Sequence, residues 1–398
     1  MNRAIQIGIV FVLAAAMRGQ TAAPANGPRE QALLLEQQNK FPEAEAAWRA
    51  YSQAHPANAE PYAHLGLLEA RQEHYAEAIP LYRKALRINP SLPGLRLNLG
   101  LALFKGGQSK DAILEFNTLL KTAPPDSPEA QRLRLLIGMA HYGLGEYSAA
   151  VPYFKQAAAR DTQNLPLRLV LAHSCLWSKQ YQCVMDTYHE ILTLNAESAE
   201  ADMLAGEALD EQQDSDGAIK MFRAAVAANP KEPGVHYGLG YLLWRQKQYP
   251  EALLQFQAEI ENNPNHAQSL VYMGDCYLQQ NDSADARSPL EKGLALDPSL
   301  GIADLDLGII DSQAGRNDDA LRELRKALAL IPGDVNVHWR LARLLRTMGR
   351  TEEANAEFET VKKMNKAAFA DLDRKIANGR LQKHDDAQTP QTPAAPAQ

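Results

Sequence analysis

Side chains that could support catalysis or bind a metal ion occur throughout this chain, but their spacing does not assemble a site. The sequence contains ten histidines and no HExxH pair. Several of them lie far apart, at His74, His141, His189 and His236. Zinc hydrolases of that type place two histidines one helical turn apart. We therefore predict no enzymatic or metal chemistry from the histidines.

Two short motifs approach the pattern of a ligand loop without completing it. The DSDG stretch at residues 214–217 is similar to the start of a calcium loop. Gln212 occupies the first ligand position, however, and Arg223 the position of the closing glutamate. The Gly-Leu-Gly stretches at residues 143–145 and 238–240 lack the third glycine of a dinucleotide fingerprint. We interpret the acidic stretch as a solvated turn between helices and predict no cofactor.

Composition and charge bound the classes of function that remain. The chain has 398 residues, of which 45% are hydrophobic, so it can bury a large core. Its formal net charge is −7 and its pI is about 5.9. Because general nucleic-acid binding needs a basic surface, we do not expect a nucleic-acid partner.

The N-terminus has the layout of an export signal. Arg3 precedes a mostly apolar stretch, residues 4–17, and small residues follow it. This order predicts a cleavable secretory signal peptide with a flexible lead over residues 1–24. A retained anchor or a buried helix is the alternative reading. No other stretch is long and apolar enough to cross a membrane, so we expect no stable span after cleavage.

The elements that would position any site come from a repeat of thirty-four residues, seen clearly from Ala59 to Leu92. Its first half places small and apolar residues at helical spacing, together with one acid, at Tyr62, Leu65, Gly66 and Glu69. Its second half repeats the spacing and then stops at a proline, with Ala78, Tyr82, Ala85 and Pro90. Each half therefore predicts one helix, and Gly66 leaves room for the two to approach closely.

This pattern resembles the tetratricopeptide repeat, in which an aromatic residue, Leu-Gly, a small residue, a bulky ring, alanine and a closing proline recur. It departs from that family at Glu69, where an aromatic or aliphatic residue is usual. The resemblance implies an all-α fold, a right-handed superhelical solenoid of helix-turn-helix repeats. Stacking is expected because one hairpin cannot bury enough apolar surface to offset its ordering entropy.

Ten such units fill residues 25–368, with an insertion at residues 127–130 before the fourth. The fifth unit is the weakest interior match, since Ala172 replaces the glycine and Val184 the alanine. Beyond the tenth, Phe369, Leu372 and Ile376 predict a capping helix over residues 369–381. The proline-rich tail, residues 382–398, is predicted to be disordered.

Two of the three cysteines fall within one repeat. Cys175 lies late in the first predicted helix of the fifth unit and Cys183 early in its second helix. In an exported protein this pair could form a disulfide that closes the hairpin. The alternative is that both are small buried residues. Cys276 has no evident partner.

In the family that this chain resembles, the first helix of each repeat lines a concave groove. The packing face uses positions 4, 7, 8 and 11 of each unit, so positions 5, 9 and 12 are expected to point into the groove. Here these positions are strongly apolar and aromatic, and they become basic in the tenth unit. The predicted groove residues are Leu97, Leu101, Phe104, Leu135, Met139, Tyr142, Leu169, His173, Met203, Tyr237, Tyr241, Trp244, Val271, Asp275, Trp339, Arg343 and Arg346.

An exposed apolar strip of this kind usually marks a partner site. The alternative is that neighbouring first helices pack closely enough to bury the strip. A clamp for a C-terminal carboxylate is disfavoured, because that mode in the family uses Lys and Asn where this chain has Ala63 and Leu67.

We therefore expect a non-enzymatic scaffold that binds partner proteins or peptides in its groove. It is expected to be exported to the periplasm or beyond in a bacterium. The alternative is an accessory protein of envelope polysaccharide handling, in which Tyr237, Tyr241 and Trp244 stack on a glycan. Ligand chemistry would separate the two hypotheses.

Overall fold

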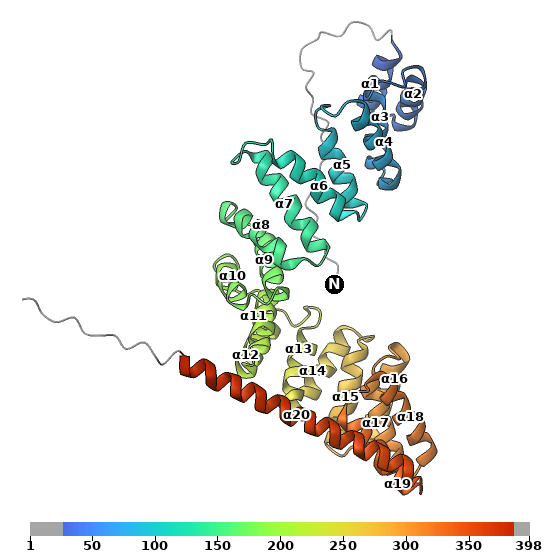
Figure 1. Ribbon diagram of the computed structural model, residues 1–398, viewed down its shortest axis with the longest axis vertical. Helices are drawn as coiled ribbons and strands as arrows, with labels where there is room; N and C mark the ends of the chain where they lie inside the picture. The colour runs from blue at the N-terminus through green and yellow to red at the C-terminus, as the bar shows by residue number, and fades with distance from the viewer. Residues whose placement is uncertain (1–26, 386–398) are drawn as a thin grey trace, which may run out of the picture. The chain divides into compact units, whose positions relative to one another are not determined.

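The computed structural model describes residues 27–385, and these residues form twenty α-helices and no β-strand (Figure 1). The predicted all-α class is confirmed. The chain divides into two compact units, residues 1–221 and 222–398, and the boundary falls inside α12 (Ser215–Ala228). The predicted signal segment, residues 1–24, lies outside the described residues. Among the described helices, none has the length and apolar character needed to span a membrane.

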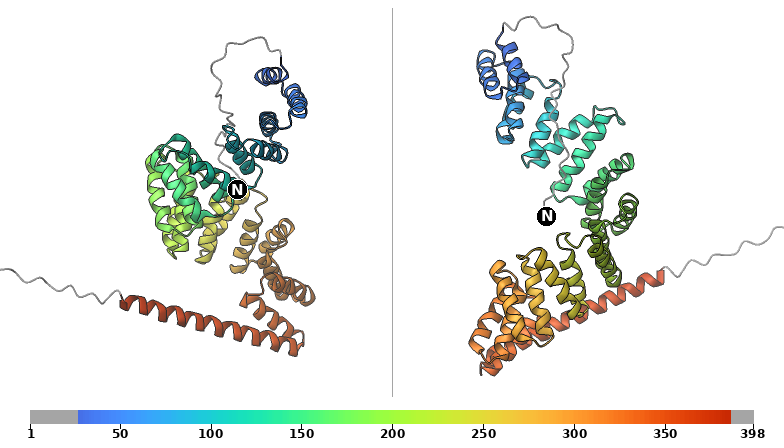
Figure 2. Two further views of the ribbon diagram at one scale, coloured as in Figure 1. Left: turned by 45° about the horizontal axis from the view of Figure 1, so that its top comes forward. Right: turned by 180° about the vertical axis from the view of Figure 1, so that it is seen from behind.

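Consecutive helices pair as antiparallel hairpins, which two further views show from other sides (Figure 2). Unit 1 holds α1 (Pro28–Gln37), α2 (Phe41–Ala54), α3 (Glu60–Arg71), α4 (Tyr75–Ile88), α5 (Leu95–Lys105), α6 (Ser109–Leu120), α7 (Pro128–Gly143), α8 (Tyr147–Arg160), α9 (Leu165–Trp177), α10 (Tyr181–Leu194) and α11 (Ala199–Glu211). Unit 2 holds α13 (Val235–Arg245), α14 (Tyr249–Asn262), α15 (Ala267–Gln279), α16 (Ser283–Leu296), α17 (Gly301–Gln313), α18 (Asn317–Leu330), α19 (Val335–Thr347) and α20 (Thr351–Asp385).

The same turn joins the two helices of every hairpin. The fifteenth residue of each predicted unit has a positive φ, between 57° at Asn39 and 77° at Gly107. The next residue donates its backbone N–H to the carbonyl of residue eleven, as His74 does to Glu69 at 3.0 Å. This is the Schellman arrangement, which satisfies carbonyls at the end of the first helix. Six of the ten positions are not glycine, so the tertiary pairing holds L residues in a conformation that costs them energy.

Glycine against a ring sets the distance between the helices of a hairpin. A Cβ added at Gly66 would lie 2.8 Å from the ring of Tyr82, and one at Gly100 would lie 2.6 Å from Phe116. Both rings are fully buried. Full burial of such a side chain stabilises the fold by about 1.5–3 kcal/mol. The ring therefore occupies the space that the missing side chain leaves.

The insertion before the fourth unit becomes part of a helix rather than a loop. Helix α7 begins at Pro128 and has 16 residues, whereas the predicted unit began at Gln131. The Ser127 hydroxyl accepts a hydrogen bond from the Ala130 N–H at 3.1 Å and caps the helix. Three of the four inserted residues therefore extend the helix by about one turn at its N-terminal end, and the fourth, Ser127, caps it.

The predicted capping helix is not a separate element. Helix α20 runs from Thr351 to Asp385 without interruption, so the second helix of the tenth repeat continues through residues 369–381 and into the first residues of the predicted tail. Phe369, expected to cover the end of the solenoid, is 69% exposed. The sequence contains no proline or cap between residues 361 and 369 that would end the helix there.

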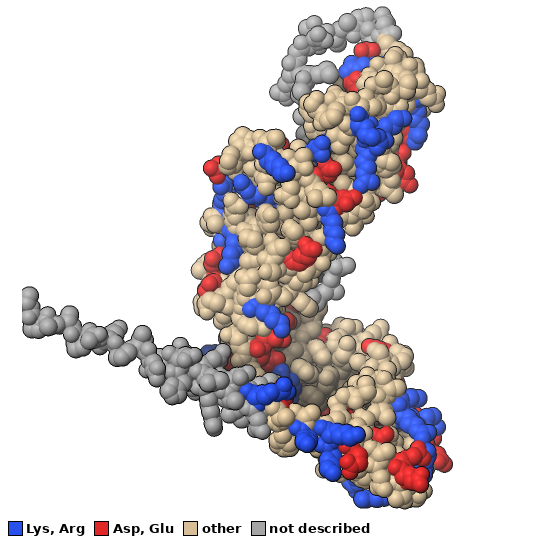
Figure 3. Space-filling view, viewed as in Figure 1, with Lys and Arg blue, Asp and Glu red and all other residues tan. Residues whose placement is uncertain are grey.

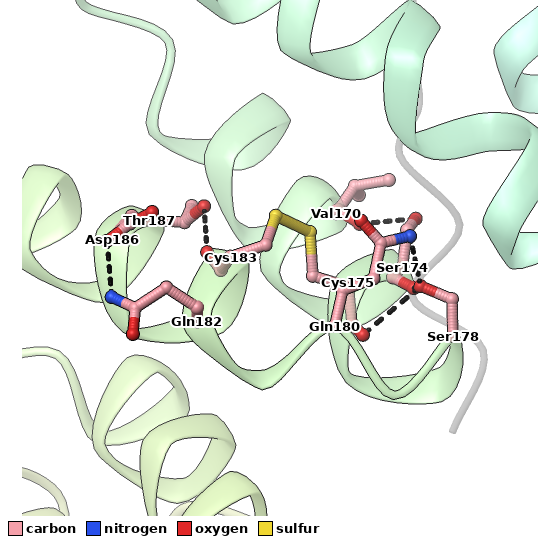
Figure 4. The surroundings of a disulfide bond; sticks show 9 residues. All are labelled: Val170, Ser174, Cys175, Ser178, Gln180, Gln182, Cys183, Asp186 and Thr187. Atoms are coloured by element: carbon pink, nitrogen blue, oxygen red, sulfur yellow. Dashed lines mark hydrogen bonds between the residues drawn. A yellow bond between two sulfur atoms is a disulfide. The ribbon is translucent and has the colours of Figure 1, made fainter. Parts of the chain in front are cut away.

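A disulfide joins Cys175 near the end of α9 to Cys183 near the start of α10 (Figure 4). Their Cα atoms lie 5.8 Å apart, a usual span for this bond. Closing so short a loop contributes about 2–3 kcal/mol by restricting the unfolded chain. Cys276 is free and buried, and burial together with the nearby Asp275 and Asp306 raises the pKa of its thiol to about 12.

Replacing a hairpin glycine should destabilise unit 2. A Cβ at Gly240 would lie 2.8 Å from the ring of Phe256, so Gly240→Leu should lower the free energy of unfolding by roughly 1–3 kcal/mol. Gly333→Leu is the matched control, because no atom lies within 4 Å of an added Cβ there. Urea denaturation followed by circular dichroism measures both. Equal stability of the two variants would contradict the packing described here.

Leu101 should behave as a core residue rather than a groove residue. Its side chain is fully buried, so Leu101→Glu should place a charge in the core and lower stability by more than about 3 kcal/mol. Leu114→Glu on α6 is the control, since Leu114 is 65% exposed and should tolerate the change. Thermal melts of both variants check this. A Leu101→Glu variant as stable as the control would show that the Leu101 side chain is exposed rather than buried.

Candidate partner-binding surface

The first helices place the predicted groove residues in three different environments. Leu101, Val271 and Asp275 are buried, so their prediction as groove residues is wrong. The reason is that α3 contacts α5 and that α15 contacts both α13 and α17, which closes the space over these positions. The reading in which neighbouring first helices bury the strip is therefore correct at these three positions.

The remaining predicted residues keep part of their surface open. Arg343 and Arg346 are exposed, and twelve others are half-buried. The half-buried residues in unit 1 are Leu97, Phe104, Leu135, Met139, Tyr142, Leu169, His173 and Met203. Those in unit 2 are Tyr237, Tyr241, Trp244 and Trp339. Because the two sets belong to separate compact units, each is a surface of its own.

In unit 1 the apolar set rests on the core and presents its other side outward. Leu97 and Phe104 pack against the core cluster that contains Phe116. Leu135 and Met139 pack against the cluster that contains Phe154. We name the eight unit 1 residues the first-helix row. A row that is anchored but not covered can accept an apolar side chain from outside.

An aromatic cluster overlaps this row. It is made of Tyr142 and His173, which belong to the row, and of Tyr147 and Trp177. The ring centroids of Tyr147 and Trp177 are 5.8 Å apart, and those of His173 and Trp177 are 6.4 Å apart and stacked. Tyr142 meets His173 edge-on at 6.5 Å. Burial lowers the pKa of His173, so its ring is neutral near pH 7. We name these four residues the α7–α9 aromatic cluster.

The sequence prediction missed two members of this cluster. Trp177 is the thirteenth residue of its repeat and Tyr147 the seventeenth, whereas the helical geometry predicts groove residues at positions 5, 9 and 12. The available signal was a large apolar residue one step beyond position 12, at the end of the first helix. Trp177 is 56% exposed, which is unusual for so large a ring.

Unit 2 carries a second group of rings. Tyr272 on α15 lies between residues of α13 and α14, with its centroid 5.4 Å from Tyr241, 4.8 Å from Trp244 and 5.8 Å from Phe256. Tyr237 and Tyr241 stack at 6.2 Å. Burial, followed by the neighbouring Tyr241, raises the pKa of Tyr237 to about 12. The groove pattern does not predict Tyr272, because Tyr272 stands at position 6 of its repeat rather than at position 5, 9 or 12.

Beneath these rings lies a pair of buried carboxyl groups. The indole N–H of Trp244 donates a hydrogen bond to Asp275, which fixes the ring. Burial, and then the charge of Asp275, holds the pKa of Asp306 well above its usual range, while Arg340 opposes the shift. Oδ2 of Asp306 has no hydrogen-bond partner among the described residues. Asp275 is therefore a support for the surface and not part of it.

On α19 the predicted basic residues contact aromatic rings. The guanidinium carbon of Arg343 lies 4.7 Å from the ring centroid of Trp339. Arg346 lies 5.3 Å from the ring of Phe358 on α20. Cation–π contacts of this kind hold the Arg side chains against the helix surface. Arg343 and Arg346 remain exposed and available to an outside group.

Charged side chains of both signs alternate over the C-terminal part of unit 2 (Figure 3). A pocket of about 350 Å³ lies there between α16, α17 and α18. Arg287 and Arg316 on its wall both donate to the buried carboxylate of Asp311. Both cations are already paired with Asp311. They are therefore not available to bind an anion in this pocket. Within residues 27–385, no group of three or more His, Cys, Asp or Glu side chains is placed to hold a metal ion.

The buried carboxyl pair predicts a dependence of stability on pH. The folded protein keeps the Asp306 proton to a higher pH than the unfolded chain, so wild-type stability should fall as pH rises above the ordinary Asp pKa, by up to about 1.4 kcal/mol per pH unit. Asp306→Asn removes this titration, so the wild type should lose more stability than the variant between pH 5 and pH 8. Urea denaturation at both pH values tests this. Burial raises the pKa of Asp304 to about 6. Asp304 titrates in both proteins, so its contribution to the pH dependence does not affect the comparison. Identical pH profiles would show that Asp306 ionises normally.

Relatives with known names share the repeat but not the length of this chain. RNA polymerase-associated protein CTR9 of Caenorhabditis elegans is 24% identical over 262 residues, covering 64% of this chain and 23% of that protein. Anaphase-promoting complex subunit 3 of Schizosaccharomyces pombe is 26% identical over 137 residues, covering 34% and 21%. Cellulose synthase operon protein C of Pseudomonas fluorescens is 26% identical over 200 residues, covering 49% and 16%. The chain thus spans about a quarter or less of the length of these three relatives.

Two solved structures are similar at low sequence identity. The APC/C hetero-tetramer Cut9–Hcn1 matches with a TM-score of 0.47 and 15% identity, covering 80% of this chain and 75% of that one. The structure of pilF from Pseudomonas aeruginosa matches with a TM-score of 0.46 and 17% identity, covering 50% and 91%.

Family models agree with the repeat along most of the sequence. Models described as tetratricopeptide repeat match residues 29–93, 186–233, 203–266 and 237–300, residues 69–137 and 312–376, and residues 131–164. The matched ranges follow the helical hairpins that the structure contains. The chain therefore belongs to the tetratricopeptide repeat family.

Proposed function

We propose that this protein is a non-enzymatic scaffold that binds partner proteins or peptides in a groove lined by the half-open faces of its first helices. The observation that carries the proposal is the first-helix row of unit 1, eight half-buried residues of which six pack against the core, namely Leu97, Phe104, Leu135, Met139, Tyr142 and Leu169. CTR9 and anaphase-promoting complex subunit 3 are, by name, an RNA polymerase-associated protein and a subunit of a complex. Their repeats support an interaction role for this chain.

The row fits a peptide with several apolar side chains. Its members come from α5, α7, α9 and α11, so an extended or helical segment that crosses these helices would meet one apolar contact on each. Phe104 and Tyr142 supply ring surface, and aromatic anchors usually carry a large share of binding energy. The energy of binding would come from covering surface that the solenoid itself leaves open.

We propose that the protein works outside the cytoplasm. The apolar stretch at residues 4–17 supports export. The Cys175–Cys183 disulfide supports an oxidising compartment, because such bonds are rare in reducing ones. A periplasmic or extracellular scaffold accommodates both observations.

Glycan binding is the second candidate, and the ring group of unit 2 favours it. Tyr237, Tyr241, Trp244 and Tyr272 lie within stacking range of one another, and Tyr237, Tyr241 and Trp244 are half-buried. Flat aromatic faces with hydroxyl groups suit a sugar ring. One relative is named cellulose synthase operon protein C. A glycan array probed with wild type and Trp244→Ala separates this candidate from peptide binding.

Peptide binding should depend on the first-helix row. We would select peptides from a random twelve-residue library on the full chain and then measure their affinity by fluorescence polarisation. Phe104→Ser with Leu135→Ser should weaken the selected peptides about tenfold or more, since each removes an apolar anchor.

Leu114→Ser, a change of the same kind at an exposed site on α6, is the control and should bind as the wild type does. Circular dichroism establishes that all variants are folded. Selected peptides that bind the row variant and the control equally well would place the site elsewhere. A failure to select any peptide would count against peptide binding and leave the glycan candidate.

A further inference from the structure

The repeat places acids beside the α7–α9 aromatic cluster. Thirty-four residues separate His173 from Glu207 and Trp177 from Glu211, so each pair occupies one position in two successive repeats. The helices that carry them, α9 and α11, contact each other. Moving from the fifth repeat to the sixth, the same face of the first helix therefore changes from aromatic to acidic.

Contacts between repeats support this alignment. Tyr147 on α8 contacts Trp177 on α9, with ring centroids 5.8 Å apart. One repeat later, Tyr181 on α10 donates its hydroxyl proton to Glu211 on α11 at 3.2 Å. Both contacts join position 17 of one repeat to position 13 of the next. Glu211 therefore occupies in the sixth repeat the position that Trp177 occupies in the fifth, on a helix that contacts α9.

The negative charge on this face is not balanced on its own helix. Helix α11 contains five acidic residues and no Lys or Arg. Glu207 is exposed as a residue, and no described side chain donates a hydrogen bond to its carboxylate. Partial burial of the carboxyl group, followed by the charge of Glu211, raises the pKa of Glu207. Burial, followed by Tyr147 and then Glu200, raises the pKa of Tyr142, so one acid of α11, Glu200, acts electrostatically on the aromatic cluster.

Rings and carboxylates in this arrangement select a cation. The face of an indole attracts a guanidinium or ammonium group, and an adjacent carboxylate supplies charge-assisted hydrogen bonds to it. An anionic partner segment would be repelled by Glu207 and Glu211. A purely apolar segment would remove water from both carboxylates without replacing their hydrogen bonds, which is unfavourable.

We infer that the surface formed by Tyr147, Trp177, Glu207 and Glu211 binds a cationic side chain, Arg or Lys, of the partner segment. The inference rests on the proposed function, because the first-helix row would hold the apolar side chains of the same segment. The first-helix row supplies affinity for apolar side chains. The surface formed by Tyr147, Trp177, Glu207 and Glu211 selects those segments that also contain a basic residue.

The test uses three synthetic peptides and the full chain. One labelled nine-residue peptide alternates leucine and arginine, and two matched peptides carry glutamine or glutamate in place of arginine. Fluorescence polarisation should show the arginine peptide binding about tenfold or more tightly than the glutamine peptide, and the glutamate peptide weakest. Trp177→Ala should weaken the arginine peptide more than the glutamine peptide.

Charge at the site is tested against the same change of charge elsewhere. Glu207→Gln with Glu211→Gln should remove most of the preference for arginine. Glu43→Gln with Glu77→Gln, both exposed and on the second helices α2 and α4, alters the net charge equally and should leave the preference intact. Equal loss in both double variants would mean that only net charge matters and would overturn the inference.

The remaining outcomes separate the two proposals. If the arginine and glutamine peptides bind equally and both depend on Phe104 and Leu135, the first-helix row stands and the cationic site is wrong. If arginine is preferred but Phe104→Ser with Leu135→Ser has no effect, the cationic site stands without the row. If none of the three peptides binds, both proposals are overturned.

Discussion

The close approach of two helices in each hairpin is the constraint on which the rest of this structure depends. Where Gly66 and Gly100 meet the rings of Tyr82 and Phe116, the ring fills space that any larger residue would occupy. The hairpin then has a fixed width, and the next hairpin can pack on it at the same spacing. Repetition of one contact, rather than a single large core, builds each unit. In the eighth and ninth repeats Leu290 and Leu324 take the place of the ring without changing this logic.

The turn at position 15 also brings the two helices of a hairpin together, although it requires a backbone conformation that is unfavourable for most residues. It reverses the chain in three residues and satisfies a carbonyl at position 11 in every hairpin. Residues such as Glu73 and Lys247 accept a left-handed backbone there, although glycine would adopt it more easily. Packing between the two helices therefore determines the positive φ of these residues, against their intrinsic preference for a negative φ.

A solenoid of this kind leaves its first helices only partly covered. We propose that partners bind the surface that stays uncovered. The covering is uneven: Leu101 is fully buried where α3 and α5 meet, whereas Met139, at the same position of the next repeat, is half-buried. The same position of the repeat can therefore be core in one unit and surface in another. Rings gather between α7 and α9, acids follow on α11, and the disulfide of the fifth hairpin closes the loop after Trp177. The fifth repeat, which matches the repeat pattern least well, therefore carries both the disulfide and part of the α7–α9 aromatic cluster.

The sequence by itself determined the helices, their pairing and their register, because a period of thirty-four residues with glycine, ring and proline at constant places leaves one arrangement of hairpins. It also indicated the cysteine pair and most residues of the half-open surface. It did not determine that residues 128–130 extend α7, nor that α20 continues past residue 369, because helix ends depend on caps and neighbours that periodicity does not contain. The tertiary structure alone decided that Leu101, Val271 and Asp275 are buried and that Trp177 and Tyr272 belong to ring clusters. Their exposure is set by how closely one first helix approaches the next, a distance that no single repeat encodes.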